Sequence, residues 1–203
     1  MLSVAEHAGW ANVLGVTARG DVPYVAERRR VTLIEAGLPT QPFHHEATAM
    51  TDDAANALIT KVRRSVAAHA VDALRRIAIE LAPVHAVVAL VIRESPFDDL
   101  PDDYAAVRKS YQLLCSADGM LYQLAICRAA RELNLDVRLC RRGGETSLAA
   151  QALGVKAAEI EKFVSDIGRP SGPPWTQEHR RAYAAGIAVL AEHRRGPLQV
   201  ARV

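Results

Sequence analysis

The segment from Val84 to Glu94, VHAVVALVIRE, constrains the fold more than any other part of the sequence. It is a nearly uninterrupted β-branched, apolar run, and a charged pair ends it before the turn-rich SPFDDLPDD. A strand that is apolar on both faces must be covered on both faces, as parallel strands are in α/β sheets. Such sheets bind ligands at the carboxyl ends of their strands. Glu94 stands at that end and is therefore the first candidate site residue.

The length and composition indicate one globular domain. The chain has 203 residues, half of them hydrophobic, and a net charge of +2, so it can bury one sizeable core. We expect a single domain over residues 1–196 and a tail over 197–203. The small net charge does not by itself mark a nucleic-acid-binding protein, although arginines occur in clusters along the chain.

The cysteines and the N-terminus predict an intracellular protein. Cys115, Cys127 and Cys140 are odd in number and lack CxxC spacing, which favours free thiols in a reducing cytoplasm over disulfides or a zinc site. The segment MLSVAEHAGW has neither the basic nor the apolar region of a signal peptide. No apolar run approaches the ~20 residues that cross a bilayer. We therefore expect a cytoplasmic protein that makes no membrane contact.

Hydrophobic periodicity predicts the order of the elements. We expect three antiparallel strands between Asn12 and Glu35 (VLGVTA, VPYVAE, VTLIE), a long helix from Thr51 to about Ala82, and then the buried strand. Two helices (104–114 and 118–133), a strand (LDVRLC), two short helices (146–153 and 156–167) and a last helix after Pro173-Pro174 should follow. The helix over 118–133 is apolar nearly all round, which predicts that Leu124 lies in the core.

This order, together with four segments, resembles the ribonuclease H-like fold and, within it, RuvC-type Holliday-junction resolvases. The segments are VLGVTARG, ALVIRESPF, SADGMLYQLAICRAARELNLDVRLC and EHRRAYAAGIAVLAEH. The resemblance implies an α/β fold with a five-stranded mixed sheet of order 3-2-1-4-5 and helices on both faces. The long crossover helix predicts that the strand over 84–92 runs parallel to the first strand, which we take to be residues 12–18.

The chemistry of that family requires carboxylates that converge on two divalent metal ions, Mg²⁺ or Mn²⁺, during phosphodiester cleavage. Its first-strand acid would fall at Thr17 or Ala18, and neither can supply a carboxylate. The resemblance implies that Glu94 and Glu178 are metal ligands. It also implies that His179 is a general acid/base or water-positioning group, although Glu178 and His179 lie about one turn before the best-aligned positions of the last helix.

Two functions of different classes follow. The first is that of a divergent, metal-dependent nuclease or resolvase relative that acts on or recognises structured nucleic acid, with its cleavage activity kept, rebuilt or lost. Arg141, Arg142, Arg180 and Arg181 would then contact phosphate, and a homodimer is left open. The second is that of a non-catalytic binding or scaffold protein with the same fold, which the missing first-strand acid favours.

Two further patterns each have a functional and a purely structural interpretation. Residues 147–163 match helix-turn-helix spacing, but acidic residues on the second helix oppose phosphate contact, and packing of both helices on the sheet explains the same residues. His44, His45 and Glu46 form a cluster that could bind a transition metal, but adjacent histidines in an extended segment point opposite ways, which favours a polar loop. Their role is left open.

Overall fold

The computed structural model describes residues 1–167, 172–194 and 196–200. Its strands are β1 (Leu2–His7), β2 (Trp10–Arg19), β3 (Val22–Thr32), β4 (Ala89–Arg93) and β5 (Asp136–Cys140). Its helices are α1 (Asp52–Leu81), α2 (Tyr104–Arg108), α3 (Tyr111–Glu132), α4 (Glu145–Leu153), α5 (Ala157–Asp166) and α7 (Gln177–His193), with short helical turns η1 (Pro42–Glu46) and η2 (Ala47–Ala49). None of these helices is long and apolar enough to span a bilayer.

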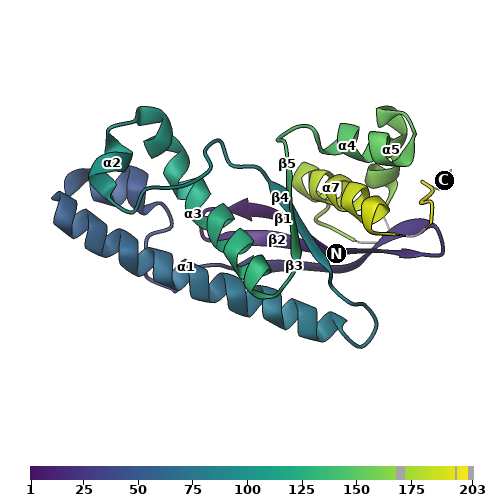
Figure 1. Cartoon of the computed structure of the whole chain (residues 1–203), viewed down its shortest axis with the longest axis horizontal. Coiled ribbons are helices and arrows are strands. Elements are labelled where there is room, and N and C mark those ends of the chain that lie inside the picture. The colour runs from purple at the N-terminus through teal and green to yellow at the C-terminus, as the bar shows by residue number, and fades with distance from the viewer. Residues whose placement is uncertain (168–171, 195, 201–203) are drawn as a thin grey trace.

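The strands form one mixed sheet of order β3-β2-β1-β4-β5 (Figure 1). The first three strands are antiparallel neighbours, and β4 runs parallel to both β1 and β5. The predicted α/β class and strand order 3-2-1-4-5 are therefore confirmed. The carboxyl ends of β1, β4 and β5 meet at one edge of the sheet because the three strands share a direction.

The identity of the first strand differs from the prediction. Strand β1 begins at Leu2 and pairs with β2 through a hairpin that turns at Gly9, which has φ +88°. Residues 12–18, which we expected to be the first strand, lie in β2 and run antiparallel to β4. The segments expected as the second and third strands form mainly one strand, β3. The hairpin at Gly9 was missed because the apolar alternation before it spans only a few residues.

Strand β3 continues through three consecutive arginines because each finds a partner. The Arg29 guanidinium pairs with Glu27 and Glu80, and Nη1 of Arg28 donates to two backbone carbonyl groups. The Arg30 guanidinium lies 3.8 Å from the ring centroid of Trp10. Charged side chains on an edge strand also discourage pairing with other chains.

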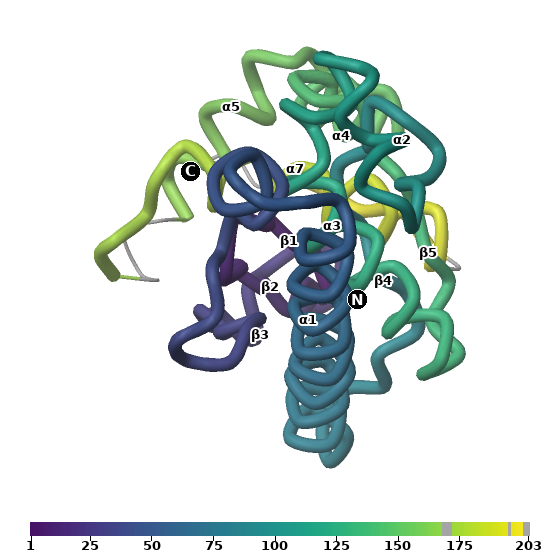
Figure 2. Tube along the Cα trace, turned by 90° about the vertical axis from the view of Figure 1, so that its left-hand side faces the viewer, coloured from purple at the N-terminus to yellow at the C-terminus, as the bar shows by residue number. Residues whose placement is uncertain are grey.

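Helices cover both faces of the sheet. Helix α1 begins after Thr51, whose side chain accepts from the Ala54 N–H group, and it packs with α3 on one face. Helices α4, α5 and α7 cover the other face. Figure 2 shows α1 between β3 on one side and β4 and β5 on the other. Leu198, near the start of the expected tail, is buried in the hydrophobic core between the sheet and helices α4, α5 and α7. Residues 201–203 lie outside the described part of the chain.

The buried strand is shorter than its sequence predicts. Strand β4 begins at Ala89, while Val84 and Val88 are exposed in the connection that follows α1. Strand β1 pairs with β4 at only three positions, beginning at Leu90. The residues before Ala89 therefore have no neighbouring strand on the β1 side. The segment that we expected to be covered on both faces is therefore covered only at its carboxyl half, next to the site.

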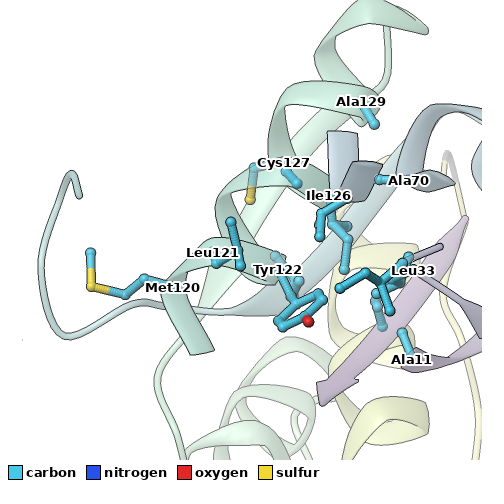
Figure 3. Packing of buried hydrophobic residues seen from close by; sticks show 14 of the residues in the cluster. Ala11, Leu33, Ala70, Met120, Leu121, Tyr122, Ile126, Cys127 and Ala129 are labelled. Carbon is cyan, nitrogen blue, oxygen red and sulfur yellow. The ribbon is translucent and has the colours of Figure 1, made fainter. Parts of the chain in front are cut away.

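Helix α3 carries much of the first core (Figure 3). It starts at Tyr111, earlier than predicted, because the Ser110 side chain accepts from the Leu113 N–H group and caps it. Tyr122 and Ile126 are buried against the sheet and α1. Leu124, which we expected in the core, is only partly buried and packs against it from outside.

Helix α7 lies unusually close to the sheet. A Cβ atom at Gly186 would come within 2.7 Å of a Val16 methyl group, so only glycine permits this approach. The Ser3 hydroxyl donates to the Ala182 carbonyl group and fixes the height of the helix on β1. These contacts hold the first turn of α7, which carries Glu178, beside the carboxyl end of β1.

Candidate functional site

Two carboxylates lie on neighbouring strands at the carboxyl edge of the sheet. Leu2 and Val4 face the core beneath α3, so the alternation of a strand directs Glu6 to the same side. The parallel pairing of β1 with β4 ends at Val4 and Ile92, and beyond it Glu6 and Glu94 line the same cavity at this edge. The first strand thus carries an acid after all. Sequence reasoning missed it because it assigned the first strand to β2.

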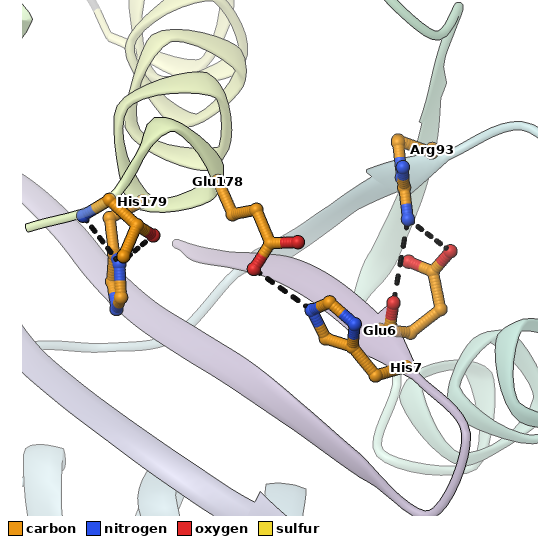
Figure 4. A network of polar contacts seen from close by, with 6 residues as sticks. Glu6, His7, Arg93, Glu178 and His179 are labelled. Atoms are coloured by element: carbon orange, nitrogen blue, oxygen red, sulfur yellow. Dashed lines mark hydrogen bonds and ion pairs between the residues drawn. The ribbon is translucent and has the colours of Figure 1, made fainter.

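The Glu6 carboxylate is paired with Arg93 (Figure 4). Arg93 Nη2 lies 3.0 Å from Glu6 Oε1 and also donates to the Glu6 carbonyl oxygen at 3.4 Å. The Glu6 side chain is only 12% exposed. Burial raises the pKa of this carboxyl, and Arg93 opposes part of that shift. An arginine thus supplies the positive charge beside the first-strand acid.

A cavity of about 520 Å³ opens beside this pair, between the strand ends and α3. The polar side chains that line it are Glu6, Arg93, Glu94, Ser95, Cys115, Ser116, Gln123, Arg141 and Arg142. Glu94 is exposed at its rim, and so are both arginines of the loop that follows β5. We call this space the α3 cavity.

Two more cavities continue along the same edge under α7. A cavity of about 140 Å³, here the α7 cavity, is bordered by Arg93, Glu145, Glu178 and Arg181, among others. A third, of about 440 Å³, lies between α4, α5 and α7 and is bordered by Arg180 and again by Arg181 and Glu145. Because Arg93 borders the first two cavities and Arg181 the last two, the three spaces adjoin one another.

The predicted site residues are distributed among these cavities. Glu94 lines the α3 cavity, whereas Glu178 lines the α7 cavity and pairs with His7, whose Nε2 lies 3.0 Å from Glu178 Oε2. His179 lines neither cavity and lies apart from the Glu178–His7 pair (Figure 4). The structure therefore does not bring Glu94, Glu178 and His179 into one cavity.

The donor set does not fit the two-metal centre that the resemblance implies. Among the described residues, no three His, Cys, Asp or Glu side chains are grouped so that they could hold a metal ion. The Arg93 guanidinium already donates a hydrogen bond to one carboxylate oxygen of Glu6. A positive charge next to the ligands lowers their attraction for a cation. We therefore derive no step through Mg²⁺ or Mn²⁺.

His179 stabilises the start of α7. Its Nδ1 accepts from the Thr176 N–H group at 3.2 Å and lies 2.7 Å from the Thr176 hydroxyl oxygen. Its ring stacks on Trp175 with centroids 5.6 Å apart. Burial lowers the pKa of this imidazole, Arg28 lowers it further, and Glu178 opposes the shift. A neutral ring that accepts through Nδ1 suits a helix cap.

This arrangement predicts a pH-dependent contribution of His179 to stability. The unfolded chain binds the proton near the ordinary value of 6.5, whereas the folded protein binds it only at lower pH. The free energy of unfolding should therefore fall as the pH drops through 6.5. His179→Gln keeps an acceptor but does not titrate, so its urea-unfolding profile should be flatter over this range. Equal pH dependence of the two proteins would show that His179 does not act in this way.

The remaining sequence candidates have structural partners. His44, His45 and Glu46 are exposed on η1, and the described residues around them form no metal-binding group. The Asp118 carboxylate on α3 accepts from the N–H groups of Phe43 and His44 at 3.0 and 3.1 Å, which ties η1 to α3. The apolar sides of α4 and α5 pack against α7, which accounts for the helix-turn-helix spacing.

Four residues that sequence reasoning missed border the site: Glu6, His7, Arg93 and Gln123. The first two precede the glycine turn at Gly9, but LSVAEH does not alternate regularly between polar and apolar residues, so its strand signal is weak. Arg93 is part of the charged pair that ends the apolar run, and the sequence gives no sign of its pairing with Glu6. Gln123 lies within an apolar helix segment, and no local pattern distinguishes its side chain from others on that helix.

The chain was compared with known proteins. No family model matches it, and no curated protein matches it. Its structure is similar to that of RuvC from Thermus thermophilus, with 13% sequence identity over 92% of this chain and 90% of that chain and a TM-score of 0.45. A similarity of this degree assigns no activity to this chain.

Proposed function

We propose that this protein binds structured nucleic acid through phosphate contacts at the carboxyl edge of its sheet, without a metal ion. One observation carries the proposal: five arginines border three adjoining cavities along this edge. They come from β4, from the loop after β5 and from α7, and they are Arg93, Arg141, Arg142, Arg180 and Arg181.

Arginine suits this role because its planar guanidinium donates two parallel hydrogen bonds to a phosphate. Arg141, Arg142 and Arg181 are exposed, so phosphates can reach them. The net charge of the chain is only +2, so the attraction for a polyanion is local to this edge. Binding of this kind is strongly salt-dependent, because each phosphate contact releases counterions.

A metal-dependent phosphodiesterase is the second candidate, and the presence of Glu6 and Glu94 in one cavity favours it. Two carboxylates on adjacent strands are the beginning of a divalent-cation site. The Glu6–Arg93 pair argues against it, because a cation would have to displace the guanidinium. Binding measurements with Mn²⁺ and with EDTA separate the two candidates, since only the phosphodiesterase requires the metal.

Arg141→Ala together with Arg142→Ala should lower affinity for a labelled four-way DNA junction by about tenfold at low salt. The slope of log K against log salt should fall by about 2, near 1 for each lost phosphate contact. Fluorescence anisotropy across a salt series measures both quantities. EDTA should leave the affinity unchanged.

Lys61→Ala together with Arg64→Ala is the matched control. Both residues are exposed on α1 and line none of the three cavities, so this variant loses the same charge at a different place. Its affinity and salt slope should match those of the wild type. The proposal is wrong if the wild type does not bind the junction at low salt, or if both double variants lose affinity equally.

A further inference from the structure

Two side chains that line the α3 cavity each carry a buried acceptor oxygen without a hydrogen-bond donor. Gln123 is only 5% exposed, and its Oε1 has no partner among the described residues. Glu6 Oε2 likewise has none, since Arg93 binds the other oxygen of that carboxylate. Both side chains line the same cavity. Buried acceptors without partners are rare in folded proteins and mark the place where a donor is expected.

The orientation of the Gln123 amide follows from its contacts. Its Nε2 donates to the Arg93 carbonyl oxygen at 3.4 Å and lies 3.6 Å from Cys127 Sγ. The opposite orientation would bring Oε1 against that carbonyl oxygen, with two acceptors facing each other. Oε1 is therefore the atom of this amide that is left without a donor.

The charges around the cavity restrict the ligand. Arg93 is paired with Glu6, and Glu94 also lines the cavity, so the positive charge that attracts a phosphate is that of the exposed Arg141 and Arg142. The two unpaired oxygens attract N–H donors. A ligand that carries both a phosphate and an amino group satisfies both sets, and a volume of about 520 Å³ lies within the usual range of small-ligand pockets.

We propose that the α3 cavity takes one unstacked nucleotide whose base carries an exocyclic amino group. The amino group donates to Gln123 Oε1 and Glu6 Oε2, and the phosphate lies against Arg141 and Arg142. Cytosine, adenine and guanine have such a group, whereas uracil and thymine do not. This inference rests on the proposed nucleic-acid binding and adds a preference among bases.

Gly119 allows the cavity to be filled without disturbing the fold. It is exposed on α3 and lines the cavity, and a Cβ atom added there meets nothing within 4 Å. Gly119→Leu therefore extends a side chain into open space at the cavity, and leucine also favours the helix more than glycine does. This variant tests occupancy of the cavity independently of Gln123.

The first experiment compares two DNA hairpins that differ only in one unpaired nucleotide, dC or dU. The wild type should bind the dC hairpin about tenfold more tightly, as expected for a base edge held by two hydrogen bonds. Gln123→Leu and Gly119→Leu should each bring the ratio of the two affinities close to one. The Arg141→Ala, Arg142→Ala variant should weaken both hairpins by the same factor.

The second experiment uses Cys115, which is exposed at the cavity, as a reporter of mononucleotide binding. Cys127 and Cys140 are buried, and burial raises the pKa of each thiol to about 11, so iodoacetamide should modify Cys115 first. Mass spectrometry follows the reaction. Saturating dCMP should slow the modification of Cys115 in the wild type more than dUMP does, and the difference should vanish in Gln123→Leu.

The two proposals fail in different ways. If the hairpins bind with a salt dependence but with equal affinity, base selection in the α3 cavity is wrong and phosphate binding stands. If neither hairpin binds, the proposed function is wrong. The protection of Cys115 by dCMP then tests nucleotide binding in the α3 cavity separately. Equal protection of Cys115 by dCMP and dUMP, or no protection by either, overturns the cavity proposal.

Discussion

Arg93→Glu is expected to lower the affinity for nucleic acid by about 100-fold at low salt, more than removal of any other single arginine at the sheet edge. Arg93 borders both the α3 cavity and the α7 cavity, so reversal of its charge acts on both. The substitution also leaves the buried Glu6 carboxylate without its partner. Fluorescence anisotropy with the DNA junction measures the loss.

The same substitution should create an affinity for divalent cations. It adds a third carboxylate at position 93, beside those of Glu6 and Glu94, and oxygen ligands of this kind bind Mn²⁺ and Mg²⁺. Titration calorimetry should detect Mn²⁺ binding to Arg93→Glu and none to the wild type. Mn²⁺ should also raise the apparent stability of the variant, because it binds the folded state.

Lys61→Glu is the control for Arg93→Glu, because it makes the same change of charge at an exposed position on α1. It should reduce junction affinity only slightly and bind no Mn²⁺. Strong Mn²⁺ binding by the wild type, lost in Glu94→Gln, would instead support the phosphodiesterase hypothesis. It would show that a metal ion displaces the Arg93 guanidinium from Glu6.

Ile126→Ala should lower the free energy of unfolding by about 2–5 kcal/mol, the largest stability loss that we predict. Ile126 is 2% exposed and lies in the first core beside Tyr122 and Leu33 (Figure 3). The loss combines the transfer free energy of the removed methyl and methylene groups with the cost of the cavity left behind. Urea unfolding measures it.

Leu124→Ala is the matched comparison on the same helix. Leu124 is only partly buried, so the same kind of truncation should cost clearly less than at Ile126. A smaller loss for Ile126→Ala than for Leu124→Ala would mean that α3 presents a different face to the sheet.

The fold was largely predictable because its signals are local. The long helix α1 has an apolar residue at each turn and a threonine cap, and it matches its prediction within one residue at each end. The strand order 3-2-1-4-5 followed from the order of elements and the right-handed crossover. Strand β1 was missed because its few alternating residues could not be distinguished from a disordered N-terminus by pattern alone.

The site was predictable only in part. The sequence by itself placed Glu94 at a strand end and drew attention to the arginine pairs at Arg141 and Arg180, because strand ends and charge runs can be recognised locally. The sequence could not show that Glu178 lines the α7 cavity, apart from Glu94, while the adjacent His179 caps helix α7. Adjacent residues on a helix point about 100° apart, and only the packing of that helix decides what each one meets.

The tertiary structure alone decided that Glu6, Arg93 and Gln123 meet. They come from β1, β4 and α3, and their contact depends on the parallel register of two strands and on the height of a helix above them. The sequence specifies these features through long-range packing, which has no local pattern. What the sequence determined by itself is the set of elements, since hydrophobic periodicity and caps act within a few residues. The chemistry of the sheet edge arises only where those elements come together.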